Sequence, residues 1–223
     1  MIESFGALRM LARLALSFVV GIAALLLLIG SQRYDSSSVV RFFAQSCSSM
    51  PCWQGIRPGT TTTSEALAVL RALPWVEQIS PVYASPNANN NGTVLIYWKW
   101  SRSYPFADTR ALVQQGIIVT DEGVVRQIYL TTGIPLGDLW LTLGSAEGGV
   151  INSLTDQQRL RVDQTSFFVR DGLAATASLY ADCSTELASF WHTPVYFWLR
   201  TNMPLPDRTP LSAQYQQVHA SLC

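Results

Sequence analysis

The sequence predicts an α+β fold, with an N-terminal transmembrane helix followed by two similar units, each a helix packed on an antiparallel sheet. Three observations lead to this prediction. An uncharged apolar run covers residues 14–30, a helical apolar spacing occurs twice at an offset of 70 residues, and strand-like segments follow each occurrence. The expected domains are a cytoplasmic N-terminus (1–9), a transmembrane signal anchor (10–30), a tether (31–46), a first α+β unit (47–132) and a second α+β unit (133–223).

The composition excludes two broad classes of protein. Charged residues make up 13% and aromatic residues 11% of the 223 residues, which is too apolar for a disordered chain. Basic and acidic residues balance at 15 each, so the surplus of Lys and Arg that phosphate binding requires is missing. We therefore expect a folded domain and no nucleic-acid partner.

The N-terminal apolar segment predicts how the chain meets a membrane. Leu14 to Gly30 carries no charge, and a helix over 10–30 rises about 30 Å, the thickness of a bilayer core. Arg9 and Arg13 precede the segment and favour a cytoplasmic N-terminus. The interpretation is a single-pass protein of the cytoplasmic membrane with its C-terminal domain outside the cytoplasm. A cleaved signal peptide and a buried core helix are the alternatives; the large residues that end the segment disfavour a cleavage site.

Four cysteines are consistent with an exported domain that carries two disulfides. The favoured pairing joins Cys47 to Cys52 and Cys183 to Cys223. The alternative for the first pair is a redox or metal site. However, redox motifs usually separate their cysteines by two residues rather than four, and no second Cys or His pair lies near enough to complete a zinc site.

The first half of the exported region begins with a helix. Thr62 and Glu65 are spaced as a capping box, and Pro74 ends the helix. Its apolar face is formed by residues at helical spacing: Ala66, Val69, Leu70 and Leu73. The alternating segment 94–100 predicts a strand, and segments 116–120 and 124–130 predict a hairpin around Asp121-Glu122-Gly123.

The second half repeats this order. Leu136, Leu139, Trp140 and Leu143 have the same helical spacing as the first set. Segments 167–170 and 173–180 flank an Asp-Gly turn and predict a hairpin. A further strand is expected over 195–200 and a short terminal helix over 212–222. The match favours an internal repeat, although an α+β chain can also show such a match by chance.

The segments GIRPGTTTTSEALAVL and IPLGDLWLTLG, with the later FFVRDGLAATASLY hairpin, carry a family resemblance. They resemble the helix-opening units of the small lipoprotein of the β-barrel assembly machinery, which occur in tandem in β-lactamase inhibitor protein. The resemblance spans Gly55 to Leu199 and departs at Pro74, where glycine is expected. It implies helices packed on an antiparallel sheet, extracytoplasmic protein binding and no catalytic residue.

Residue patterns for catalysis are weak in this chain. It has two histidines, His192 and His219, and lacks a G-x-S-x-G elbow, a phosphate loop and a dinucleotide fingerprint. His192 with Asp182 and a nearby serine is the most suggestive catalytic trio, and a structural histidine explains His192 better. Whether the protein is an enzyme stays open; we assign no catalytic residue, cofactor or metal.

The aromatic strands carry the functional prediction. Alternation places Trp98, Trp100, Phe197 and Leu199 on one sheet face and a second set on the other. The second set is the expected partner-binding surface: Tyr97, Lys99, Tyr196 and Trp198. The alternative is that helices cover both faces and bury all of them. The sequence therefore predicts a membrane-anchored module that binds or assembles an unidentified protein, with an inhibitor of an extracytoplasmic hydrolase, or a cell-envelope hydrolase, as alternatives.

Overall fold

The protein is described by a computed structural model that covers the chain in several stretches. The described residues are 3–31, 36–44, 47, 49–83, 92–104, 106, 115–156, 159–180, 185–203 and 209–222. The chain divides into two compact units, Met1–Asp35 and Ser36–Cys223.

The first unit is the helix α1, Glu3–Ser31, whose side chains from residue 13 to 28 are exposed. Among the described residues, no helix is both long enough and apolar enough to cross a membrane. The predicted transmembrane anchor over residues 10–30 is therefore not supported. That span includes Arg13, and its uncharged run from Leu14 to Gly30 is 17 residues long, shorter than the roughly 20 apolar residues that cross a bilayer core.

The second unit consists mostly of one continuous antiparallel sheet of eight strands in the order β1-β2-β3-β4-β8-β7-β6-β5. The strands are β1 Val76–Tyr83, β2 Val94–Trp100, β3 Gln115–Asp121, β4 Val124–Pro135, β5 Gly148–Asp156, β6 Arg159–Phe168, β7 Leu173–Tyr180 and β8 Pro194–Arg200. The predicted fold class, a transmembrane helix followed by two α+β units, is therefore wrong. A long-range pairing of β4 with β8 joins the strands into one sheet, and helices are few.

Element order along the chain recurs within this single sheet. The helix α3 (Thr63–Ala72) precedes β1 to β4, and the helix α4 (Leu136–Leu143) precedes β5 to β8. The expected boundary between residues 132 and 133 falls inside β4. The β4–β8 pair lies at the centre of the strand order, so strands from both halves of the chain contribute to the middle of the sheet.

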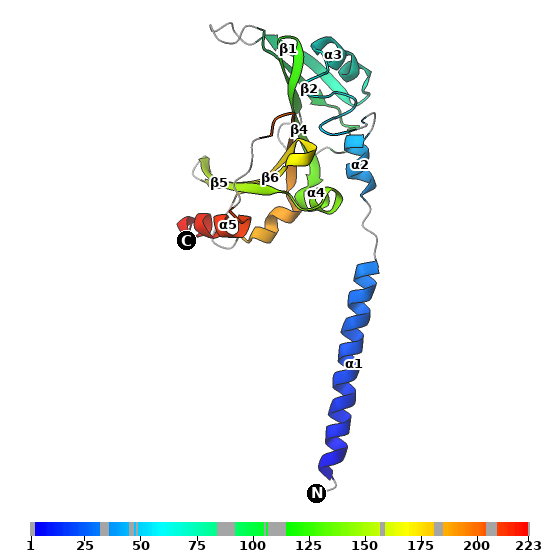
Figure 1. The fold of residues 1–223 in the computed structure, drawn as a ribbon. Coiled ribbons are helices and arrows are strands. Elements are labelled where there is room, and N and C mark those ends of the chain that lie inside the picture. Colours follow the sequence, from blue (N-terminus) through cyan, green and yellow to red (C-terminus); the bar gives the residue numbers. More distant parts are fainter. Residues whose placement is uncertain are drawn as a thin grey trace. The chain divides into compact units, whose positions relative to one another are not determined.

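The helices of the second unit pack on one face of the sheet, which we call the core face. The remaining helical elements are α2 Ser37–Ala44, the 3-10 turns η1 Val169–Asp171 and η2 Leu187–His192, and α5 Leu211–Leu222. Phe42 of α2, Leu70 of α3 and Leu139 of α4 are fully buried in the same hydrophobic cluster as the core-face side chains. Figure 1 shows α2, α3 and α4 on one side of the sheet.

The helix α3 begins where the sequence predicts. The backbone N–H of Thr62 donates to Oε2 of Glu65 at 2.8 Å, and the N–H of Glu65 donates to the Thr62 hydroxyl at 3.3 Å. These hydrogen bonds satisfy two donors at the start of the helix, as a capping box requires. The helix ends at Ala72, two residues before Pro74.

Aromatic rings fill the centre of the core. Trp53 stacks on Trp98 with ring centroids 5.7 Å apart, and Phe42 packs against Phe197 at 5.5 Å. Trp100 stacks on Tyr104 at 4.1 Å. These contacts join α2 and the loop before α3 to the strands β2 and β8.

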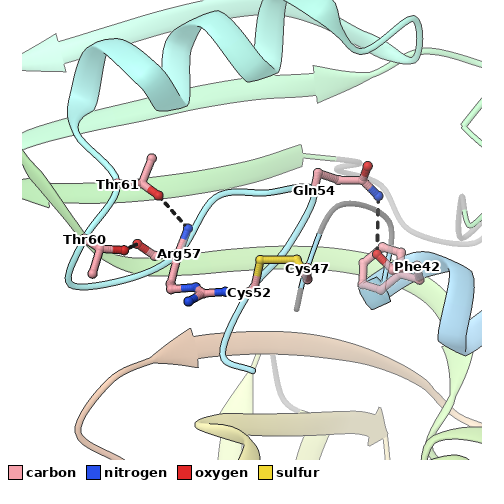
Figure 2. Close-up of a disulfide and its surroundings, with 7 residues drawn as sticks. All are labelled: Phe42, Cys47, Cys52, Gln54, Arg57, Thr60 and Thr61. Carbon is pink, nitrogen blue, oxygen red and sulfur yellow. Dashed lines mark hydrogen bonds between the residues drawn. A yellow bond between two sulfur atoms is a disulfide. The ribbon is translucent and has the colours of Figure 1, made fainter. Parts of the chain in front are cut away.

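A disulfide between Cys47 and Cys52 closes the loop after α2 (Figure 2). Beside it, Nε2 of Gln54 donates to the carbonyl oxygen of Phe42 at 3.3 Å. The predicted pairing of these two cysteines is confirmed, whereas Cys183 and Cys223 lie outside the described residues. The disulfide and the hydrogen bond together hold α2 against the loop that leads to α3.

Candidate functional site

The sheet face opposite the core face, which we call the open face, carries the predicted partner-binding residues. Along β2 and β8 buried and accessible side chains alternate, as in a strand covered on one side. Tyr196 is 42% and Trp198 40% exposed, Tyr97 is half-buried and Lys99 is exposed. The predicted assignment of these side chains to the face opposite Trp98, Trp100 and Phe197 agrees with the described strands.

The strand register brings the aromatic residues of β2 and β8 toward each other. Tyr97 lies opposite Ile117, Ile117 opposite Tyr129, and Tyr129 opposite Trp198. Tyr196 lies opposite Thr131 in the neighbouring row. Residues directly opposite on adjacent strands project from the same face, so these rows form one continuous surface across β2, β3, β4 and β8.

This surface contains a hollow with a volume of about 440 Å³. Its lining includes side chains from four strands: Tyr97, Ile117, Val119, Tyr129, Tyr196 and Trp198. The hollow thus unites three of the four predicted residues. Lys99 does not line it and lies beside it, in the row of Gln115.

Sequence reasoning missed the contribution of β3 and β4 to the hollow. The ring of Tyr129 meets Trp198 edge to face, with centroids 5.6 Å apart, and its hydroxyl donates to Oε1 of Gln127. Ile117 and Val119 supply an aliphatic floor. Alternation within the predicted hairpin could have identified these residues as outward-facing, but not their position beside β8, because that position depends on the β4–β8 pairing.

The hollow offers binding groups rather than a catalytic constellation. Its described lining contains no carboxylate, histidine, cysteine or amine; its polar groups are tyrosine hydroxyls, the Trp198 indole N–H, and the side chains of Gln115 and Thr131. Aromatic residues with an apolar body and a polar tip recur at the centre of protein interfaces. The arrangement suits an apolar group that enters the hollow and hydrogen-bonds at its edge.

A second, polar hollow of about 490 Å³ lies at the β6–β7 turn, and Glu147, Arg170 and Asp171 line it. Burial raises the pKa of the Asp171 carboxyl, and the nearby negative charge of Glu147 raises it further, while Arg170 opposes the shift. Oε2 of Glu147 accepts the Val169 N–H at 2.9 Å, and its Oε1 lies 3.4 Å from Nε of Arg170. These partners give Glu147 a structural role in the turn.

The described residues give little support to the catalytic trio or to a metal site. His192 is exposed at the end of η2, and Asp182 of the same trio lies outside the described residues. Within the described part of the chain, no three His, Cys, Asp or Glu side chains gather as metal ligands would. The open face remains the surface on which predicted site residues converge.

Comparisons of the chain with protein-family models, with curated proteins and with solved structures found no match.

Proposed function

We propose that this protein is an extracytoplasmic module that binds a protein partner on its open face, without catalysis by that face. The observation that carries the proposal is the hollow in which Tyr97, Tyr129, Tyr196 and Trp198 converge. Tyr196 and Trp198 are 42% and 40% exposed, whereas Val195, Phe197 and Leu199, which alternate with them on β8, are buried on the core face. Large aromatic side chains left accessible around a hollow supply contact area at low cost in conformational entropy when a partner covers them.

The Cys47–Cys52 disulfide supports the extracytoplasmic location, because disulfides persist in oxidising compartments and are rare in the cytosol. The test is alkylation of the protein directly from intact cells, followed by mass measurement. Protection of both cysteines from the alkylating reagent supports the location. Full alkylation of Cys47 and Cys52 would contradict it.

Binding is tested by affinity capture of the full chain with two matched double variants. Tyr196→Ala/Trp198→Ala removes two aromatic side chains that line the hollow. Leu154→Ala/Tyr180→Ala removes two comparably exposed side chains, 50% and 55%, from strands β5 and β7 outside it. Recovery of one stoichiometric partner by the wild type and the second variant, but not by the first, supports the proposal. Equal recovery by all three proteins contradicts it, provided that circular dichroism shows all three to be folded.

Two alternative functions predict different outcomes, which capture and activity assays distinguish. An inhibitor of an extracytoplasmic hydrolase would recover a hydrolase through the open face and reduce its turnover. A cell-envelope hydrolase would instead depend on the polar hollow, where two carboxylates interact and the pKa of Asp171 is raised. Cleavage of envelope polymers that is lost in Asp171→Asn and kept in Tyr196→Ala/Trp198→Ala would favour the hydrolase.

A further inference from the structure

The hollow on the open face selects uncharged groups. Aromatic and aliphatic side chains form most of its lining, with Gln115 and Thr131 as the polar exceptions. Burying a charged group against such a lining costs free energy unless an opposite charge pairs with it. The part of a partner that enters the hollow is therefore apolar.

Two cations flank the hollow at opposite corners. Lys99 is exposed on β2 and lies in the row that leads through Gln115 to Tyr196. Arg200 follows Trp198 on the open side of β8 and shares a row with Leu95 through the intervening strands. Of the salt bridges between described residues, none involves Lys99 or Arg200. Both cations are thus available to a partner.

Among the described residues, an acidic side chain lies beside Lys99. Glu77 on the edge strand β1 lies directly opposite Lys99 in register, and both side chains are exposed. No salt bridge joins the two among the described ion pairs. Glu77 therefore weakens the positive potential at Lys99 without neutralising it by contact.

The strand geometry fixes the spacing of the two corners. Lys99 and Arg200 are three strand intervals apart across the sheet, and their rows are offset by four residue positions along β8, from Tyr196 to Arg200. With about 4.8 Å between strands and about 3.4 Å per residue, the diagonal is roughly 20 Å. An extended segment covers this distance in about six residues.

We propose that the partner presents an extended segment with apolar side chains at its centre and a carboxylate at each end, about six residues apart. The apolar side chains enter the hollow, and the carboxylates lie at Lys99 and Arg200. This inference rests on the proposed binding function and specifies the chemistry of the partner. Opposite charges attract and like charges repel across an interface, so Lys99 and Arg200 favour a segment with acidic ends and disfavour one with basic ends.

The test uses the full chain and a synthetic peptide, acetyl-Asp-Ser-Phe-Ser-Trp-Ser-Asp-amide with a fluorescent label. Alternate side chains of an extended peptide project to one face, so both acids and both aromatic rings face the sheet. The matched peptides carry Asn or Lys at both ends. Anisotropy titrations are expected to show the acidic peptide binding most tightly, with each exposed ion pair contributing up to about fivefold in affinity.

Charge reversal separates recognition from structural damage. Lys99→Glu/Arg200→Glu should lower the affinity for the acidic peptide and raise the affinity for the Lys-ended peptide. A loss of folding cannot raise an affinity. Glu77→Gln should raise the affinity for the acidic peptide a few-fold, because it removes the negative charge beside Lys99. Equal affinities for the three peptides, or no exchange of preference in the reversed variant, would overturn the inference.

A neutral hexasaccharide of β-linked glucose is titrated in parallel. Tighter binding of the saccharide than of the acidic peptide, lost in Trp198→Ala, would also overturn the inference in favour of a glycan. If this inference alone fails, capture of a partner will still depend on Tyr196 and Trp198, but the charge at the peptide ends will have no effect on affinity. Failure of the proposed function appears as no dependence on Tyr196 and Trp198 in either experiment.

Discussion

The side chain of Gln214 hydrogen-bonds to the backbone of Ile151 and Gly149 at the edge strand β5, as a neighbouring strand would. Its side-chain Oε1 accepts the Ile151 backbone N–H at 2.8 Å, and its Nε2 donates to the Gly149 carbonyl at 3.0 Å. One carboxamide on α5 thus satisfies two outward-pointing groups of the edge strand β5. Unpaired edges invite pairing with other chains, so α5 protects this edge as well as packing on it.

Gln214→Leu should therefore destabilise the protein and promote association. The variant leaves a buried backbone donor and acceptor of β5 unsatisfied, and each such loss costs about 1–3 kcal/mol. Urea unfolding should show a free energy of unfolding lower by about 2 kcal/mol. Light scattering should show larger species as concentration rises. Gln217→Leu, on an exposed position of the same helix, is the control and should change neither measurement.

Removal of the disulfide tests how strongly the loop after α2 is held. Cys47→Ser/Cys52→Ser frees a loop whose ends are 5 residues apart. The entropy of closing such a short loop predicts a loss of about 2 kcal/mol in the free energy of unfolding. Reduction of the wild type should produce the same loss in a thermal or urea melt. A reduced protein as stable as the oxidised one would contradict this account.

Gly116 is required by the ring that lies over it. A Cβ at this position would approach Cζ2 of Trp98 to 1.9 Å, and the two residues face each other across β2 and β3. Gly116→Ala should lower the free energy of unfolding by about 2 kcal/mol through overpacking. In a double-mutant cycle with Trp98→Leu, the combined loss should be smaller than the sum of the single losses. Strict additivity would show that the methyl group is accommodated elsewhere.

The capping box makes part of the stability depend on pH. The backbone N–H of Thr62 and, next, its hydroxyl lower the pKa of Glu65 in the folded state. Since the folded pKa lies below the unfolded one, the stabilisation is complete above the unfolded pKa and disappears as pH falls through the folded pKa. The stability difference between the wild type and Glu65→Ala should therefore shrink as pH falls below about 4.

Local sequence patterns predicted many of the individual elements. The strand over 94–100, the helix over 136–143 and the capped helix α3 occur with bounds close to those predicted. In each, the evidence lies within a few neighbouring residues, as alternation, helical spacing or a cap. β7 occurs over the predicted residues 173–180, but the segment predicted to pair with it, 167–170, covers only the last two residues of β6, and a 3-10 turn over Val169–Asp171 takes up the rest.

The edge strands β1 and β5 escaped prediction for physical reasons. β1 contains Pro81, and Gln78 has a φ of 48°, so the register shifts and alternation is broken. β5 is short of large apolar residues, and contacts distant in sequence, those with Gln214, hold its outer edge. The fold class was wrong for a related reason. The pairing of Tyr129 with Trp198, which merges the strands into one sheet and creates the hollow, has no local signature.

The central position of β8 has a consequence for synthesis. The N-terminus of a chain leaves the ribosome first. The strands β1 to β7 are therefore synthesised before β8, which joins β4 to β7 in the sheet. Until residue 200 emerges, β4 and β7 each present an open hydrogen-bonding edge. A chain that stops after Tyr180 would keep both edges, and the nascent protein depends on prompt arrival of its last strand to avoid pairing with its neighbours.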